Sequence, residues 1–179
     1  MGTVLPDILA PRLSVVFCGI NPGMVAAATG HHFAGRGNRF WRVLHLAGFT
    51  PEELRPEQDR TILRYGCGLT TVVERPTARA EQLSPEEFRA VARRFERKIG
   101  DHAPRFIGFL GKAAYAALIG QRNVPWGVQP ALFGGAVAWV LPNPSGRNRG
   151  FSVDQLVDAY RPLHLASPPP CPPNFPRAD

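Results

Sequence analysis

The stretch that most constrains the fold is residues 14–41, which read SVVFCGINPGMVAAATGHHFAGRGNRFW. It begins with the apolar run Val15-Val16-Phe17-Cys18, which is typical of a strand buried on both faces. The run is followed by Gly19-Ile20-Asn21-Pro22-Gly23, where glycines and a proline favour a tight, exposed turn. Open α/β sheets bind their ligands at the carboxyl ends of their strands. The stretch therefore predicts an α/β protein with a site at the end of its first strand.

Two side chains of this stretch are candidates for function. Asn21 carries a polar amide, and the proline after it fixes the neighbouring backbone. Asn-Pro is also common in turns, so a purely conformational role is the alternative. Phe33 lies in a segment rich in glycine and histidine, which makes it a candidate stacking surface. The alternative for Phe33 is an ordinary core aromatic.

Short apolar runs alternate with helical patterns along the rest of the chain. Strands are expected at residues 15–18, 69–73, 105–110 and 137–141, and helices at 40–47, at 51–65, and after Ser84, Gly111 and Ser152. This alternation predicts a three-layer α/β sandwich, with helices flanking a central, mostly parallel sheet of four to five strands. The strands would then open on one edge of the sheet, where a single cleft would collect the segments at Asn21, Thr70, Gly111 and Asn143.

Charge and apolar content indicate which class of partner the protein binds and where in the cell it is expected. The net charge is +7 and the pI about 10.2, which favours a polyanionic partner without choosing between DNA and RNA. No apolar run approaches the ~20 residues of a membrane-spanning helix. No signal peptide is visible, so we expect a cytoplasmic protein. The length fits one domain over residues 1–166, and the proline-rich residues 167–179 are expected to form a disordered tail.

Cysteines and histidines give little support to a metal or cofactor. The three cysteines include no C-x-x-C pair, which argues against a zinc site, a disulfide framework and an iron–sulfur cluster. His31 and His32 are adjacent, but no carboxylate or thiol lies near them in the sequence to complete a metal site. Neither G-x-x-x-x-G-K-[ST] nor G-x-G-x-x-G is present, which counts against a nucleotide-binding enzyme.

Several motifs carry a family resemblance. A first motif consists of Gly19-Ile20-Asn21-Pro22-Gly23, Thr29-Gly30, Phe33-Ala34 and Asn38-Arg39-Phe40-Trp41, and a second is Leu141-Pro142-Asn143-Pro144-Ser145-Gly146. Between them, the segments Gly68-Leu69-Thr70, Arg75-Pro76-Thr77 and 110–115 occur in the expected order. Together they resemble the mismatch-specific uracil-DNA glycosylases, a group that includes the thymine-DNA glycosylases. The resemblance implies a uracil-DNA glycosylase-like sandwich and a monomer that acts on double-stranded DNA without a cofactor.

The resemblance also implies roles for individual residues. Asn21 would orient the attacking water, because an amide can accept a hydrogen bond but cannot take a proton as a carboxylate does. Phe33 would stack on the uracil. The other substrate contacts would be Gly19, Ile20, Gly23 and Asn143. The DNA contacts would be Thr71, Lys112, Ser145, Gly146, Arg147, Asn148 and Arg149.

Two positions depart from the better-known members of the family. Arg147 stands where an aliphatic wedge is expected, and Thr71 occupies a position where a lysine can occur. The expected activity is base flipping and hydrolysis of the N-glycosidic bond of uracil, notably opposite guanine, which leaves an abasic site. No strand cleavage is expected, because no lysine is placed as a clear Schiff-base nucleophile. The alternative is a non-catalytic DNA-binding module with the same fold.

Overall fold

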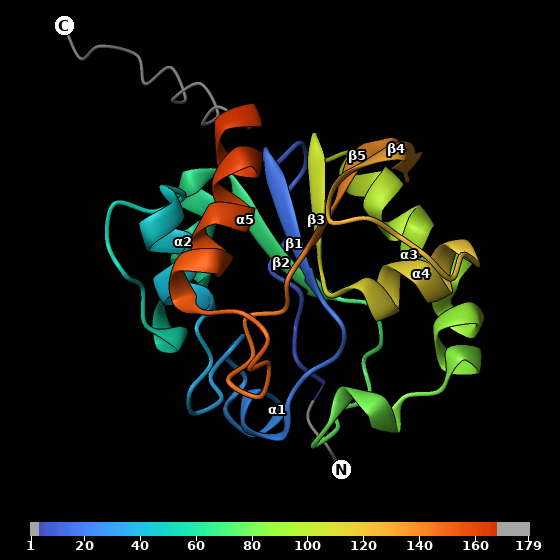
Figure 1. Ribbon diagram of the computed structural model, residues 1–179, viewed down its shortest axis with the longest axis horizontal. Helices are drawn as coiled ribbons and strands as arrows, with labels where there is room; N and C mark the ends of the chain where they lie inside the picture. The colour runs from blue at the N-terminus through green and yellow to red at the C-terminus, as the bar shows by residue number, and fades with distance from the viewer. Residues whose placement is uncertain (1–3, 168–179) are drawn as a thin grey trace, which may run out of the picture.

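The computed structural model describes residues 4–167 and contains a five-stranded sheet with the order β2-β1-β3-β5-β4. Four strands run parallel, and β4 pairs antiparallel with β5 at one edge. The strands are β1 (Val15–Gly19), β2 (Cys67–Thr71), β3 (Phe106–Leu110), β4 (Gly127–Phe133) and β5 (Ala136–Leu141). Helices cover both faces of the sheet (Figure 1), so the predicted three-layer α/β sandwich with a mostly parallel sheet is confirmed.

Several helix ends fall at residues that the sequence marks as caps. The Ser84 hydroxyl accepts a hydrogen bond from the Glu87 amide, and the Glu87 carboxylate accepts one from the Ser84 amide. Gly48 ends the second helix in a left-handed conformation. The helices are α1 (Met24–Thr29), α2 (Phe40–Ala47), α3 (Pro85–His102), α4 (Lys112–Ile119) and α5 (Val153–Ala166), with the 3₁₀ helices η1 (Pro56–Tyr65) and η2 (Ala80–Gln82).

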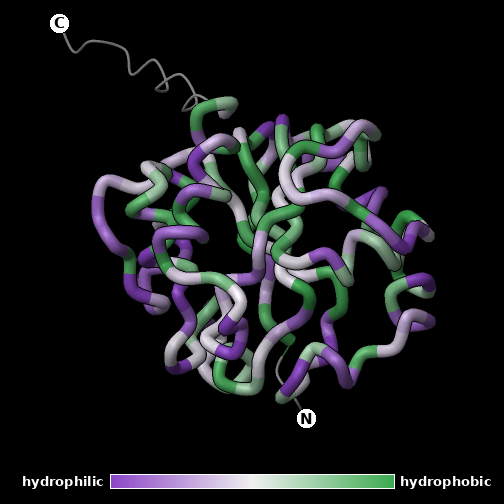
Figure 2. Tube along the Cα trace, in the orientation of Figure 1, coloured by the Kyte–Doolittle hydropathy of each residue, from purple (hydrophilic) through white to green (hydrophobic). Residues whose placement is uncertain are grey.

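The residues of β1 alternate between two hydrophobic clusters, which explains why the whole strand is apolar. Val15 and Phe17 pack with residues of α2 and α5, whereas Val16 and Cys18 pack with residues of α3 and α4. Burial raises the pKa of the Cys18 thiol, so this cysteine packs as a small apolar side chain. In Figure 2 the central strands are mainly hydrophobic, and hydrophilic segments predominate around them.

Three elements differ from the sequence-based expectation. The helix expected at residues 51–65 begins at Pro56 and is a 3₁₀ helix. The segment 24–29, for which no element was predicted, forms α1, which is too short for its periodicity to be read. The strand β4 was not predicted, because it contains a proline and exposes most of its side chains, as an edge strand can.

The carboxyl ends of the strands carry the segments of functional interest. The loop that joins β5 to α5 and the segment around α1 lie together below the sheet in Figure 1. Within residues 4–167, no helix combines the length and the apolar character needed to cross a bilayer. The tail expected from residue 167 lies outside the described residues, apart from Ser167. Ser167 is buried, and its hydroxyl donates to the Leu163 carbonyl at 2.7 Å.

Candidate active site at the carboxyl ends of the strands

The side chain of Asn21 is held by a segment far away in the sequence. Its Nδ2 donates to the backbone carbonyl of Arg75 and to the hydroxyl of Thr77, both at 2.8 Å. The Thr77 hydroxyl donates its own proton to the Arg79 carbonyl at 2.8 Å, so toward Asn21 it acts as an acceptor. Both partners of Asn21 are thus acceptors, which fixes the amide nitrogen on their side. The carbonyl oxygen Oδ1 has no hydrogen-bond partner within residues 4–167.

Backbone contacts hold the same two segments together. The Thr77 amide donates to the Pro22 carbonyl at 3.1 Å, and Gly23 pairs with Thr77 in an isolated parallel bridge. Arg75 is held in turn by Glu87, which receives two hydrogen bonds from its guanidinium. These bonds lower the pKa of the Glu87 carboxyl. Asn21 is therefore set in a turn that is supported from α3.

Phe33 combines features of both interpretations that the sequence left open. Its ring stacks on Phe40, with ring centroids 3.8 Å apart and an interplanar angle of 21°. The side chain is only half-buried, and its backbone has φ +57°, a left-handed conformation that is strained for an aromatic residue. Its own backbone N–H and C=O make no backbone hydrogen bond within residues 4–167. The packing behind the ring fixes Phe33, while its backbone groups are left available.

Gly19 leaves space beside the Phe33 ring. A Cβ added at Gly19 would lie 3.9 Å from the Phe33 ring and 3.6 Å from the Thr71 methyl group. Thr71 itself is only 6% exposed, so its side chain is buried. This burial gives no support to the expected DNA contact, which stays a prediction. Gly23, in contrast, is exposed and precedes α1.

The ends of β1, β3 and β5 converge at Gly111. A Cβ built on Gly111 would lie 3.4 Å from the Ile20 side chain, 3.9 Å from the Asn143 Cβ and 4.0 Å from its Nδ2. Asn143 Oδ1 accepts a hydrogen bond from the Ser145 amide at 2.8 Å. Nδ2 makes no hydrogen bond within residues 4–167, so it is a free donor beside the residue that precedes Asn21.

The loop after β5 exposes the residues that were expected to meet DNA. Gly146, Arg147 and Arg149 are exposed, whereas Ser145 and Asn148 are half-buried and hold the turn through hydrogen bonds. Neither Arg147 nor Arg149 makes a side-chain hydrogen bond or an ion pair in the described part of the chain. Both guanidinium groups are thus available to a ligand.

Lys112 begins α4 on the flank of this loop. Its Nζ lies 4.5 Å from the centre of the Trp126 ring, and Trp126, which is 44% exposed, packs edge-on against Phe151. Lys112 itself is half-buried.

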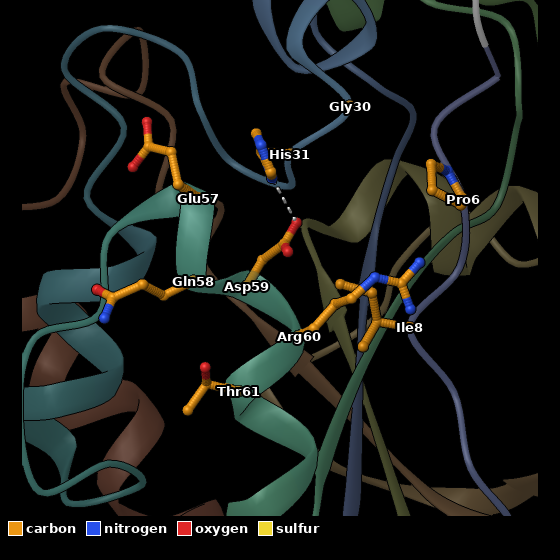
Figure 3. A pocket seen from close by; sticks show the side chains of 9 residues that line it. All are labelled: Pro6, Ile8, Gly30, His31, Glu57, Gln58, Asp59, Arg60 and Thr61. Atoms are coloured by element: carbon orange, nitrogen blue, oxygen red, sulfur yellow. Dashed lines mark ion pairs between the residues drawn. The ribbon is translucent and has the colours of Figure 1, made fainter.

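A cavity of about 160 Å³ borders the segment that precedes Phe33, but it contains neither Asn21 nor Asn143. Figure 3 shows the His31 imidazole pointing toward the carboxylate of Asp59, and their Nδ1 and Oδ2 atoms are 3.5 Å apart. Asp59 also accepts a hydrogen bond from the His32 amide at 3.0 Å. Burial lowers the pKa of His32, whose ring bonds the Pro6 carbonyl. Asp59 was not predicted as the partner of His31 and His32, because it lies on η1, far from them in the sequence.

Within residues 4–167, no group of three or more histidine, cysteine or acidic side chains is arranged to hold a metal ion. His31 and Asp59 are a pair only. The Asp59 carboxylate accepts from the His32 amide, and the His32 ring bonds the Pro6 carbonyl, so the segment before Phe33 is tied to η1 and to the amino-terminal segment.

Comparison with known proteins places this arrangement in a class of DNA repair proteins. The family model of the uracil DNA glycosylase superfamily matches residues 6–163, which is most of the chain. The chain therefore belongs to the uracil DNA glycosylase superfamily, whose members are hydrolases that act on DNA.

The fold is also similar to that of a solved structure. A candidate uracil DNA glycosylase from Methanosarcina acetivorans, determined by solution NMR, aligns with a TM-score of 0.61 and 22% sequence identity. The alignment covers 90% of this chain and 98% of that one. At this level of identity the likeness shows a shared fold.

Proposed function

We propose that the protein excises uracil from double-stranded DNA, and that it belongs to the mismatch-specific branch of its superfamily. The observation that carries the proposal is the fixed amide of Asn21. Its nitrogen is committed to Arg75 and Thr77, and its carbonyl oxygen is free at the carboxyl end of β1. Such an oxygen can accept a hydrogen bond from a water molecule and hold it in one orientation.

The reaction would be a hydrolysis of the N-glycosidic bond. The base leaves the stack and enters the space beside Gly19, where Phe33 stacks on it. The bond between the uracil N1 and the sugar C1′ breaks, and the electron pair leaves with the uracil anion. The water held by Asn21 forms the new bond to C1′ and gives up its proton to solvent. Because Asn21 cannot accept that proton, about 10²–10⁴-fold of general-base acceleration is forgone.

The edge of the base would be read by backbone groups and by an amide. The N–H and C=O of Phe33 are uncommitted to other backbone groups, and the Nδ2 of Asn143 is a free donor near Ile20. The carboxylate that follows β2, Glu74, pairs with Arg94 on α3. Asn21 is therefore the group that the proposal assigns to the water.

The charges of the chain support a DNA partner. The net charge is +7, and Arg147, Arg149 and Lys112 lie on the same edge as Asn143. We place the orphaned partner base and its flanking phosphates against the loop after β5. The enzyme would act as a monomer in the cytoplasm, would need no cofactor, and would leave the strand intact at an abasic site.

The proposal is tested with matched duplexes that differ only at one base pair. Excision from U·G, U·A and T·G pairs and from single-stranded uracil is measured by cleavage of the product with alkali. We expect excision to be fastest from U·G, and we expect no strand break before alkali is added. Binding to the U·G duplex without excision by the wild type would instead identify a non-catalytic DNA-binding module.

A further inference from the structure

Arg39 lies immediately before α2 and reaches across to the loop between β5 and α5. Its guanidinium makes four hydrogen bonds, and all four acceptors are backbone carbonyls of that loop. Nε donates to Pro144 at 3.3 Å, Nη1 to Phe151 at 2.6 Å, and Nη2 to Ser145 at 2.9 Å and to Asn148 at 2.8 Å. The Arg39 amide also donates to the Pro144 carbonyl at 3.0 Å.

This pattern determines which way the loop faces. A guanidinium has five N–H donors in a rigid plane, and here most of them bind carbonyls that are spread from one end of the loop to the other. The carbonyls therefore point inward, toward Arg39. The side chains of Arg147 and Arg149 are left on the outer surface.

Two further contacts hold the same loop. The Tyr160 hydroxyl, which is fully buried, donates to the Pro142 carbonyl at 2.8 Å and fixes the start of the loop. Near its tip, the Gly146 backbone lies directly against Gly37, so close that a Cβ at Gly146 would lie 2.6 Å from the Gly37 carbonyl oxygen. The loop is thus held at its start, along its length and at its tip before any DNA is present.

Arg39 also adjoins the segment that would bind the base. The next residue, Phe40, is the ring on which Phe33 stacks, and the indole of Trp41 donates to the His32 carbonyl at 3.1 Å. A shift of Arg39 would move the support of Phe33 and the loop after β5 together. No ion pair involves Arg39 within residues 4–167, so its charge is balanced only by carbonyl dipoles and adds to the positive potential behind the loop.

We propose that Arg39 is a positioning residue that presets the loop of residues 143–151 in the form that enters DNA and fixes it relative to Phe33. This inference rests on the proposed uracil excision. A loop that is ordered in advance binds DNA with higher affinity, because its conformational entropy has already been lost before the duplex binds. It fills the gap left by the flipped base without first having to fold.

The first test measures the free protein. Arg39→Gln and Arg39→Lys are compared with Arg42→Gln as a matched control. Arg42 is an exposed arginine of α2 whose side chain makes no hydrogen bond or ion pair within residues 4–167. Hydrogen exchange is followed in peptides that cover residues 144–151. With Arg39→Gln, we expect exchange there to be about tenfold faster, because several charge-assisted hydrogen bonds are lost. Peptides from β1 and β3 should be unchanged, and Arg39→Lys should be intermediate.

The second test measures single-turnover excision from three duplexes, in which uracil faces adenine, guanine or an abasic spacer. A loop that fills the gap matters most where a stable pair must be opened. Arg39→Gln should therefore slow excision about tenfold from U·A, less from U·G and least opposite the spacer. Arg42→Gln should match the wild type on all three.

Two results would overturn the proposal. One is a wild-type exchange pattern at residues 144–151 in Arg39→Gln; the other is an equal loss on all three duplexes. If Arg39→Gln does not fold, the Arg39→Lys variant carries both measurements, and rapid exchange of the loop in the free wild type would count against presetting. If the wild type excises no uracil, the proposed function fails, while hydrogen exchange still decides whether Arg39 orders the loop.

Discussion

The turn after β1 and the loop after β5 are each held by hydrogen bonds from a single side chain, Asn21 in the turn and Arg39 in the loop. In the turn these bonds fix a side chain, whereas in the loop they fix the backbone. In the turn, the side chain that is held is Asn21, to which we assign the water, and its oxygen Oδ1 is left free. In the loop, Arg39 holds the backbone, and the side chains of Arg147 and Arg149 are left unrestrained. The difference matches the two tasks. A water molecule must be held at one point, whereas contacts with a DNA strand have to adapt to the sequence and to the mismatch.

The largest expected effect comes from removing the side chain held in the turn. Asn21→Ala should reduce single-turnover excision by about 10²-fold or more, because the group that positions the water is lost. Binding to a duplex with an uncleavable uracil analogue and the melting temperature should stay close to wild type, since Arg75 is exposed and water can replace the amide. Excision within a few-fold of wild type would remove Asn21 from the catalytic role.

Substitutions of Phe33 test whether excision requires an aromatic ring that stacks on the base or only an apolar side chain that packs against Phe40. Phe33→Leu keeps an apolar side chain against Phe40 but loses the stack on the base, which is worth about 1–3 kcal/mol. Excision should fall accordingly for every sequence context, while Phe33→Tyr should keep most of it. Loss of melting temperature in Phe33→Leu without loss of activity in the folded fraction would assign Phe33 to the core.

Thr77 tests whether the orientation of the Asn21 amide matters. Thr77→Val removes the hydroxyl but keeps the buried shape, so the amide keeps only the Arg75 carbonyl as a partner. We expect a loss of about tenfold in the excision rate with little change in the affinity for DNA, the scale of one hydrogen bond. Thr77→Ser should restore the rate. A wild-type rate in Thr77→Val would show that the Arg75 carbonyl alone orients Asn21.

The smallest effect is expected from the unrestrained side chains of the loop. Arg147→Ala should slow excision by a few-fold, and more from U·A than from U·G, because unpairing costs more in the stable pair. The loss should persist at raised salt if the guanidinium stacks in the gap, because stacking is screened less than a phosphate contact.

The control for Arg147 is Arg64→Ala, which removes an exposed arginine near the amino end of β2, at the opposite edge of the sheet. It changes the net charge equally. Losses that are equal on both duplexes and disappear with added salt would make Arg147 a phosphate anchor.

The sequence predicted those parts of the molecule that local patterns determine. The buried strand before Asn21 and the capped helix α3 were found because apolar runs and cap residues act over a few positions. The partners of Asn21 were not found, since Arg75 and Thr77 lie 54 and 56 residues away. Arg39 was overlooked for the same reason, because its acceptors lie more than a hundred residues further along the chain.

The burial of Thr71 was missed for a different reason. The resemblance implies a DNA contact for Thr71, but Thr71 ends β2 as a buried residue, and the next residues, Val72 and Val73, continue alongside the end of β1. Val72 and Val73 donate backbone hydrogen bonds to the Gly19 and Ile20 carbonyls. Burial at a strand end depends on what the chain does next, which a local pattern does not show.

The close approach of Gly37 and Gly146 limits how the two loops can vary. A side chain at residue 146 would meet the Gly37 carbonyl, and Gly37 itself has φ +76°, a conformation that few other residues adopt. Residue 146 therefore cannot gain a side chain unless the loop at Gly37 moves away, whereas residue 37 is restricted by its own backbone conformation. Variants with altered base preference should be sought in libraries that randomise both loops at once, because a side chain added at residue 146 requires the backbone of the other loop to move.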